Sequence, residues 1–174
     1  MFTDLKINNK KFIYIFCIFL IISISTTIIY HTTQQADINY YKGHRYFEKG
    51  KFKNAVPFFK KALSENPNHK KAIFDLAYSY MWTGRSEESI DLFKKLLILE
   101  PNKNKIKKSL AEAYLWNKDY ENAILLCREV ISKNKNDIKA KFLLAQALGY
   151  SGNKKEALKL YEELLQLKEK QGEK

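Results

Sequence analysis

The sequence is poor in the residues that build small cross-linked or metal-bound proteins. Its 174 residues include two cysteines, six glycines and three prolines. Cys17 and Cys127 cannot form the dense disulfide framework of a small secreted protein, and neither lies at a paired metal-ligand spacing. The few glycines and prolines leave too few turn residues for an all-β chain. These absences exclude a disulfide-rich or zinc-stabilised module, and we expect no cofactor and no metal.

The sequence also lacks the short motifs of common catalytic and nucleotide-binding sites. It contains no phosphate-binding G-x-x-x-x-G-K-[ST] loop, no G-x-G-x-x-G, no H-E-x-x-H and no G-x-S-x-G. The three histidines are scattered, and the acidic residues form no pattern of a paired acid and base. We therefore expect that the protein is not an enzyme.

A long uncharged run lies near the N-terminus. Residues 12–30 carry no charged side chain, and Lys6, Lys10 and Lys11 precede them. A helix of this length spans roughly 28 Å, close to the ~30 Å hydrocarbon thickness of a bilayer. The few hydroxyl groups in the run can bond to carbonyl oxygens of the same helix. The run predicts a transmembrane helix or a signal peptide.

Two interpretations of this run stay open. Residues 12–22 followed by Ser23 and Ser25 fit a cleavable signal peptide, whereas Ile28, Ile29 and Tyr30 extend the apolar character past that site and favour an uncleaved anchor. The lysines before the run predict a cytoplasmic N-terminus, because positively charged flanks stay in the cytoplasm. We expect a single-pass membrane protein whose main part lies on the exported (periplasmic or extracytoplasmic) side, or a secreted protein after cleavage.

The rest of the chain repeats every 34 residues, with no insertion or deletion between four copies. Five positions keep this step: Gly43, Ala77, Ala111 and Ala145; Tyr46, Tyr80, Tyr114 and Leu148; Ala55, Ser89, Ala123 and Ala157; Phe59, Phe93, Cys127 and Tyr161; and Ala62, Leu96, Val130 and Leu164. Such a period is typical of a solenoid. It divides the chain into a basic flank (1–11), the apolar segment (12–30), a linker (31–35), four units (36–69, 70–103, 104–137 and 138–171) and a tail (172–174).

Each unit has the pattern of two antiparallel helices. The apolar residues follow the spacing of amphipathic helices, and Gly50, Gly84 and Gly152 separate the two helices of units one, two and four. Lys118 occupies the equivalent position of unit three. We expect the small residues at Gly43 and its counterparts to lie where the paired helices approach most closely, with the aromatic positions filling the volume beside them.

This arrangement resembles the tetratricopeptide repeat (TPR) family, whose 34-residue unit has small, aromatic, small and proline positions in this order. The resemblance covers residues 36–171. It implies an all-α fold, in which four helix-turn-helix repeats form a right-handed superhelix behind one N-terminal transmembrane helix or signal peptide. Asn39 and Lys42 replace apolar residues that open a typical unit, so we expect the first helix to be frayed.

In this family the concave face is lined mainly by the first helix of each unit, which implies a peptide-binding groove. Carried onto this sequence, the candidate groove residues are Tyr40, His44, Lys71, Phe74, Tyr78, Trp82, Lys105, Lys108, Glu112, Trp116, Lys139, Phe142 and Tyr150. They include a row of lysines beside a row of aromatic residues. The aromatic rings either anchor a bound peptide or pack between neighbouring helices, and the lysines either meet its carboxylates or only keep the surface solvated.

The last unit offers a second surface for association. Repeat arrays commonly finish with a polar capping helix, but the final helix here keeps Leu158, Leu165 and Leu167 before a charged tail. We expect a partner, or a second copy of the chain in a homo-oligomer, to cover this face.

Three hypotheses about function follow. The first is a membrane-attached adaptor that binds a protein or peptide in its concave groove. The second is an accessory factor in the assembly or export of a surface polysaccharide or envelope complex, because residues 81–84 and 115–118 resemble repeat segments of bacterial polysaccharide-export proteins. The third is a cytosol-facing organelle receptor or a basic helical-repeat nucleic-acid binder, since the net charge is +12. We do not expect nucleic acid as the partner, because the units resemble protein-binding repeats and an exported domain would rarely meet nucleic acid. The same charge suits an anionic lipid or polysaccharide surface better.

Overall fold

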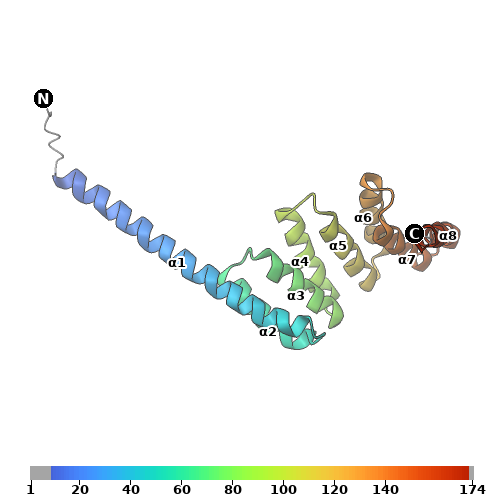
Figure 1. The fold of residues 1–174 in the computed structure, drawn as a ribbon, viewed down its shortest axis with the longest axis horizontal. Helices are drawn as coiled ribbons and strands as arrows, with labels where there is room; N and C mark the ends of the chain where they lie inside the picture. Colours follow the sequence, from blue (N-terminus) through green and yellow to red (C-terminus); the bar gives the residue numbers. More distant parts are fainter. Residues whose placement is uncertain (1–8, 173–174) are drawn as a thin grey trace, which may run out of the picture.

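The structure, a computed structural model, describes residues 9–172, which form eight helices and no strand. The helices are α1 (Asn9–Phe47), α2 (Phe52–Glu65), α3 (Lys70–Trp82), α4 (Ser86–Leu99), α5 (Asn104–Trp116), α6 (Tyr120–Lys133), α7 (Ile138–Tyr150) and α8 (Lys154–Gly172). Each helix packs against the next one along the chain, and Figure 1 shows the resulting array. The predicted all-α fold is confirmed.

The first helix is much longer than the others because three predicted segments join in it. It runs from the apolar segment through residues 31–35, the expected linker, and into the first unit without interruption. Residues 31–35 contain no glycine or proline that would break a helix. The expectation of a frayed start is wrong, since Asn39 is buried within this helix. Figure 1 shows the N-terminal half of α1 projecting from the array.

The projecting half of α1 is long and apolar, as is typical of a membrane span or of a signal sequence. Among the described residues, one helical stretch is long and apolar enough to cross a bilayer, Phe12–Phe47, whose most apolar window has a mean hydropathy of 2.6 and is not buried. The hydroxyls of Thr26 and Thr27 donate to the carbonyl oxygen of Ser23 at 2.8 and 2.9 Å. Ser25 bonds in the same way to the carbonyl oxygen of Ile21. The expected internal satisfaction of these hydroxyls is confirmed.

Small residues set the distance between the paired helices, as the repeat predicts. A Cβ atom added to Gly43 in α1 would lie 2.8 Å from Cε1 of Phe59 in α2. Ala77, Ala111 and Ala145 are fully buried at the same position of the later units. The aromatic position beside them is buried in units two and three, but Tyr46 of unit one is 37% exposed. It lies on the outer face of the first unit, where its ring stacks on Phe58 at 5.5 Å.

The turns within the units take the backbone conformation that their residues suggest. Gly50, Gly84 and Gly152 have positive φ values of 67°, 80° and 94°, a region that glycine occupies without steric cost. Lys118 takes the same conformation with φ 60°, and no other non-glycine residue in the described range has a positive φ. The breaker positions of all four units therefore share one turn geometry.

Candidate functional site

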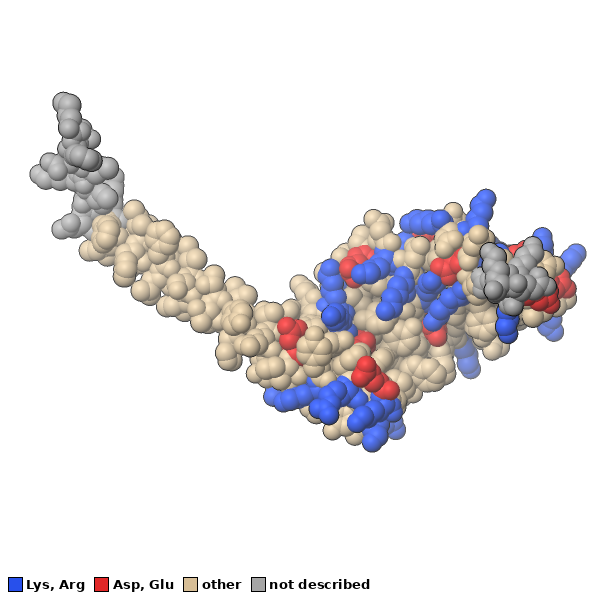
Figure 2. All heavy atoms as spheres, viewed as in Figure 1, with Lys and Arg blue, Asp and Glu red and all other residues tan. Residues whose placement is uncertain are grey.

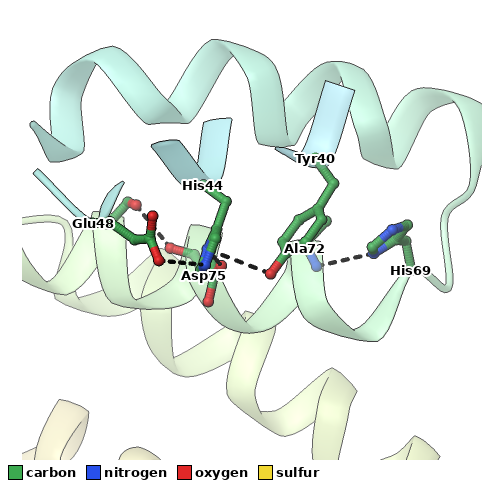
Figure 3. A network of polar contacts seen from close by, with 7 residues as sticks. Tyr40, His44, Glu48, His69, Ala72 and Asp75 are labelled. Carbon is green, nitrogen blue, oxygen red and sulfur yellow. Dashed lines mark hydrogen bonds and ion pairs between the residues drawn. The ribbon is translucent and has the colours of Figure 1, made fainter. Parts of the chain in front are cut away.

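Of the candidate groove residues of the first unit, Tyr40 is buried and His44 is half-buried between α1 and α3. His44 Nδ1 is 2.7 Å from Oδ2 of Asp75, and the hydroxyl of Tyr40 is 3.4 Å from the same nitrogen. Figure 3 shows these side chains pointing toward one another across the two helices. Burial raises the pKa of Asp75, although the hydrogen bond with His44 offsets part of this effect, and burial also raises the pKa of Tyr40. Sequence reasoning did not identify Asp75 as the partner that holds them.

A second polar network joins the first helices of units two, three and four. The hydroxyl of Tyr78 lies 3.2 Å from Oγ of Ser109 and donates to Glu112 at 3.3 Å. Lys139 Nζ donates to the same carboxylate at 2.8 Å. Burial alone would lower the pKa of Lys139, but the hydrogen bond with Glu112 outweighs it and raises that pKa. Three of the predicted residues are thus brought together across three units.

The remaining lysines of the predicted row have different environments. Lys105 Nζ lies 4.6 Å from the centre of the Phe74 ring, a distance typical of a cation–π contact. Lys108 donates to Oδ2 of Asp137 at 2.7 Å, whereas Lys71 is exposed at the start of α3. The lysines therefore occupy equivalent positions in the repeats but have different contact partners.

The predicted aromatic row divides between a cluster of three rings and a separate pair. Trp82 stacks on Phe52 with ring centres 5.7 Å apart and lies 5.6 Å from Trp116. Tyr150 instead stacks on Tyr120 at 5.7 Å. Trp82 and Trp116 are 53% and 52% exposed, so each indole packs on a neighbouring ring and still presents about half of its surface to solvent.

A hollow with a volume of about 1370 Å³ lies at the C-terminal part of the array. We call it the α5–α7–α8 groove. It is lined by Glu112, Leu115, Trp116, Lys118, Tyr120, Ile138, Lys139, Phe142, Leu143, Gln146, Tyr150, Tyr161, Leu164, Leu165 and Lys168. Five of the predicted residues line it, namely Glu112, Trp116, Lys139, Phe142 and Tyr150. The other eight lie outside it.

Sequence reasoning missed the wall that α8 gives to this groove. Tyr161, Leu164, Leu165 and Lys168 follow the i, i+3, i+4, i+7 spacing of one helix face, a signal that was present in the sequence. Leu165 is 61% exposed, which agrees with the expectation that the last helix leaves leucines uncovered. Apolar residues form most of the groove, and Lys118, Lys139 and Lys168 add positive charge around it.

A smaller basic hollow of about 330 Å³ lies on α1 and α2, lined by Lys42, Arg45, Tyr46, Lys49 and Phe58. No part of either hollow has the donors of a metal site. Within the part of the chain that the structure describes, no three His, Cys, Asp or Glu side chains are grouped closely enough to hold an ion.

Comparisons with known proteins agree on the fold. The protein is similar to a MamA fragment from Desulfovibrio magneticus RS-1, with 18% identity and a TM-score of 0.69 over 76% of this chain and 75% of that one. A MamA crystal structure has 24% identity and a TM-score of 0.68, covering 78% and 74% of the two chains. The thermophilic TPR protein TTC0263 of Thermus thermophilus has 19% identity and a TM-score of 0.64, covering 77% and 75%.

Family profiles match the sequence itself. A profile described as tetratricopeptide repeat matches residues 46–113, and a second profile with the same description matches residues 138–171, the span of the fourth unit. No curated protein shows significant sequence similarity to the chain. Proteins with this fold typically act as scaffolds for protein–protein interaction. The helix pairs, the 34-residue period and both profile matches show that this chain belongs to the tetratricopeptide repeat family.

Proposed function

We propose that this protein is a membrane-attached scaffold that binds an extended or helical segment of another protein in the α5–α7–α8 groove. The observation that carries the proposal is the groove itself, an open hollow of about 1370 Å³ bounded by three helices of a protein-binding fold. Its exposed apolar side chains include Phe142, Tyr150 and Leu165. Removing such surface from water is the main favourable term in the association of two proteins.

The charges around the groove indicate the chemistry of the partner. Lys118, Lys139 and Lys168 line the groove together with a single carboxylate, that of Glu112. Lys139 already neutralises Glu112 through their hydrogen bond of 2.8 Å. A segment with apolar anchors and flanking Asp or Glu residues therefore complements this groove better than a basic one, because unlike charges across an interface favour the correct partner and speed association.

The apolar half of α1 supports attachment to a membrane. Its residues 12–30 are exposed in the structure and uncharged, and they continue into the first repeat without a break. We propose that this half spans the bilayer with the N-terminus in the cytoplasm and the repeats on the exported side. The protein would then present its groove at a fixed position beside the membrane.

The groove is tested by comparing variants in partner capture. Phe142→Ala and Leu165→Ser remove exposed apolar groups from the groove, whereas Leu125→Ser removes a 65% exposed leucine outside it and is the matched control. Full-length protein in detergent is incubated with membrane and soluble extracts, and retained proteins are quantified by mass spectrometry. We expect a protein retained by the wild type and by Leu125→Ser to be lost with both groove variants.

Two outcomes would contradict the proposal. Retention that is equal for all variants would show that no partner uses the groove. Loss of a dimer in light scattering with Leu165→Ser, without loss of any other protein, would show that a second copy of this chain occupies it instead. Circular dichroism confirms that each variant keeps the helical content of the wild type.

A further inference from the structure

The direction and length of α1 fix which part of the repeat array lies nearest to the bilayer. Tyr30 ends the apolar run, and Asp37 follows seven residues later, a rise of roughly 10 Å along a helix. Asp37 Oδ1 accepts a hydrogen bond from Nε2 of His69 at 2.9 Å. His69 Nδ1 accepts from the backbone N–H of Ala72, so Nε2 carries the proton. The α2–α3 connection is therefore held beside the membrane-proximal part of α1.

The α4–α5 connection lies next to it. Lys95 Nζ in α4 donates to the carbonyl oxygen of Pro67 at 2.7 Å, and Lys70 Nζ lies 3.4 Å from Oε1 of Glu100. Figure 1 shows both connections on the side of the array that faces the N-terminal half of α1. We call residues 60–71 and 94–105 together the inter-repeat edge. The opposite edge consists of the turns within the first two units, residues 43–54 and 79–90.

The inter-repeat edge is strongly basic. It carries eight lysines and two glutamates, a net charge of +6. The opposite edge, of equal length, carries five lysines or arginines and three glutamates, a net charge of +2. Figure 2 shows lysine and arginine side chains beside the projecting helix and also along the lower margin of the array, so the contrast between the edges lies in their net charges. Attraction between such charges and anionic lipid headgroups acts over about one Debye length, which is about 8 Å at physiological ionic strength.

An exposed apolar residue lies at the centre of this basic surface. Ile98, near the end of α4, is 81% exposed, the highest value among the large hydrophobic side chains that the structure describes. The equivalent positions of the other units are Ser64, Ser132 and Gln166, so the repeat itself does not require an apolar residue here. Lysines surround it in sequence at positions 94, 95 and 103. An apolar side chain among lysines is typical of surfaces that enter the membrane interface.

We propose that the inter-repeat edge binds the anionic lipid headgroups of the leaflet from which α1 emerges, with Ile98 inserted among them. This inference depends on the membrane attachment in the proposed function. The lysines supply electrostatic attraction, and the isoleucine supplies a short-range apolar contact. The array is then held by two points, the helix and the edge, so its orientation relative to the bilayer is fixed.

The test uses the full chain inserted into lipid nanodiscs, either of phosphatidylcholine alone or with phosphatidylglycerol added. A water-soluble amine reagent labels the lysines, and mass spectrometry measures the rate at each site. We expect the rates at Lys60, Lys71 and Lys94 to fall about fivefold when phosphatidylglycerol is present, the factor for roughly 1 kcal/mol per lysine at an anionic surface. The rates at Lys51 and Lys53 on the opposite edge serve as the internal reference and should not change.

A pair of variants tests the role of Ile98. Ile98→Ser should restore faster labelling of the edge, while Leu125→Ser, which removes an exposed leucine far from the edge in sequence, should leave the protection intact. Equal labelling in both kinds of nanodisc would overturn the inference and leave the membrane attachment standing. Failure of the wild-type chain to enter nanodiscs would overturn both.

Discussion

Lys118 occupies a position that three other units give to glycine. Its φ of 60° lies in the left-handed region, which costs an L-residue roughly 1–2 kcal/mol. The same lysine lines the α5–α7–α8 groove. The one strained backbone position of the four turns thus belongs to a residue that lines this groove.

Introducing glycine at position 118 and lysine at the equivalent position 84 should change the stability in opposite directions. We expect Lys118→Gly to raise the free energy of unfolding by about 1 kcal/mol and Gly84→Lys to lower it by a similar amount, since glycine removes the left-handed strain but also frees the unfolded chain. Nothing lies within 4 Å of a Cβ at Gly84, so no clash confuses the comparison. Urea unfolding followed by circular dichroism measures both free energies. An unchanged free energy of unfolding for Lys118→Gly would contradict the argument.

We expect an alanine substitution to have opposite effects on stability at Gly43 and at Gly149, although both glycines lie inside helices. At Gly43 a methyl group would meet Phe59 at 2.8 Å and Phe58 at 3.0 Å, so we expect Gly43→Ala to destabilise by about 1–3 kcal/mol through overpacking. At Gly149 the nearest atom would be Cβ of Ala157 at 3.9 Å, an ordinary contact. Gly149→Ala should therefore stabilise by up to about 1 kcal/mol through helix propensity. Urea unfolding of the two variants decides the point; equal effects would show that packing does not discriminate these sites.

Among the helices, α7 is preceded by a carboxylate that both caps the helix and bonds to the neighbouring helix α5. Asp137 precedes the helix and accepts a hydrogen bond from the N–H of Ala140 at 2.9 Å. It also accepts from Lys108 of α5 at 2.7 Å. Burial alone would raise the pKa of Asp137, but these two hydrogen bonds outweigh it and hold the pKa below its ordinary value of 3.8.

The lowered pKa predicts a pH-dependent contribution to stability. Because the folded protein holds this proton more weakly than the unfolded chain, the contribution is present above about pH 4 and is lost as the pH falls through the folded-state pKa. Asp137→Asn keeps the cap but removes the charge, so it should cost about 1 kcal/mol at pH 7 and much less at pH 3. Asp119→Asn is the control, because Asp119 caps α6 through the backbone and side-chain amides of Asn122 rather than through a lysine. A cost that does not depend on pH would contradict the assignment.

At the scale of the whole molecule, the continuity of α1 fixes the direction of the repeat array relative to the apolar segment, and so relative to the bilayer in the proposed function. A flexible linker would let the array turn freely, whereas an unbroken helix transmits its direction from residue 12 to residue 47. Thr32 and Thr33 bond to the carbonyl oxygen of Ile29 at 3.0 and 2.8 Å, so their side chains also remain within the helix. The orientation of the groove and of the inter-repeat edge follows from this one element.

Hydrogen exchange tests the continuity. We expect the backbone amides of residues 31–35 in the wild type to exchange slowly, because each bonds within α1. Thr33→Pro removes one of these bonds and should speed exchange of residues 31–37 at least about tenfold, while the amides of α3 to α7 keep their rates. Fast exchange of residues 31–35 in the wild type would show that the segment is a flexible linker after all.

The repeat could be read from the sequence because its signals are local. Gly43 and its counterparts, the glycine turns and the aromatic positions recur at one interval, and each marks a steric requirement of the helix pair itself. The contacts within the candidate site could be predicted from the sequence only in part. His44 has no sequence signal for its bond to Asp75, 31 residues away, and the contribution of Tyr161 to the groove depends on how α8 is placed beside α7.

The sequence alone therefore determined the helix pairs, their number within the described chain, and the apolar character of residues 12–30, since periodicity and hydropathy are properties of neighbouring residues. Only the tertiary structure decided that residues 31–35 continue the helix, that Trp82 and Tyr150 belong to separate groups of rings, and that the hollow lies against α8. The physical reason is that curvature and twist of the array arise from packing between units, and small rotations accumulated over several repeats decide which side chains meet.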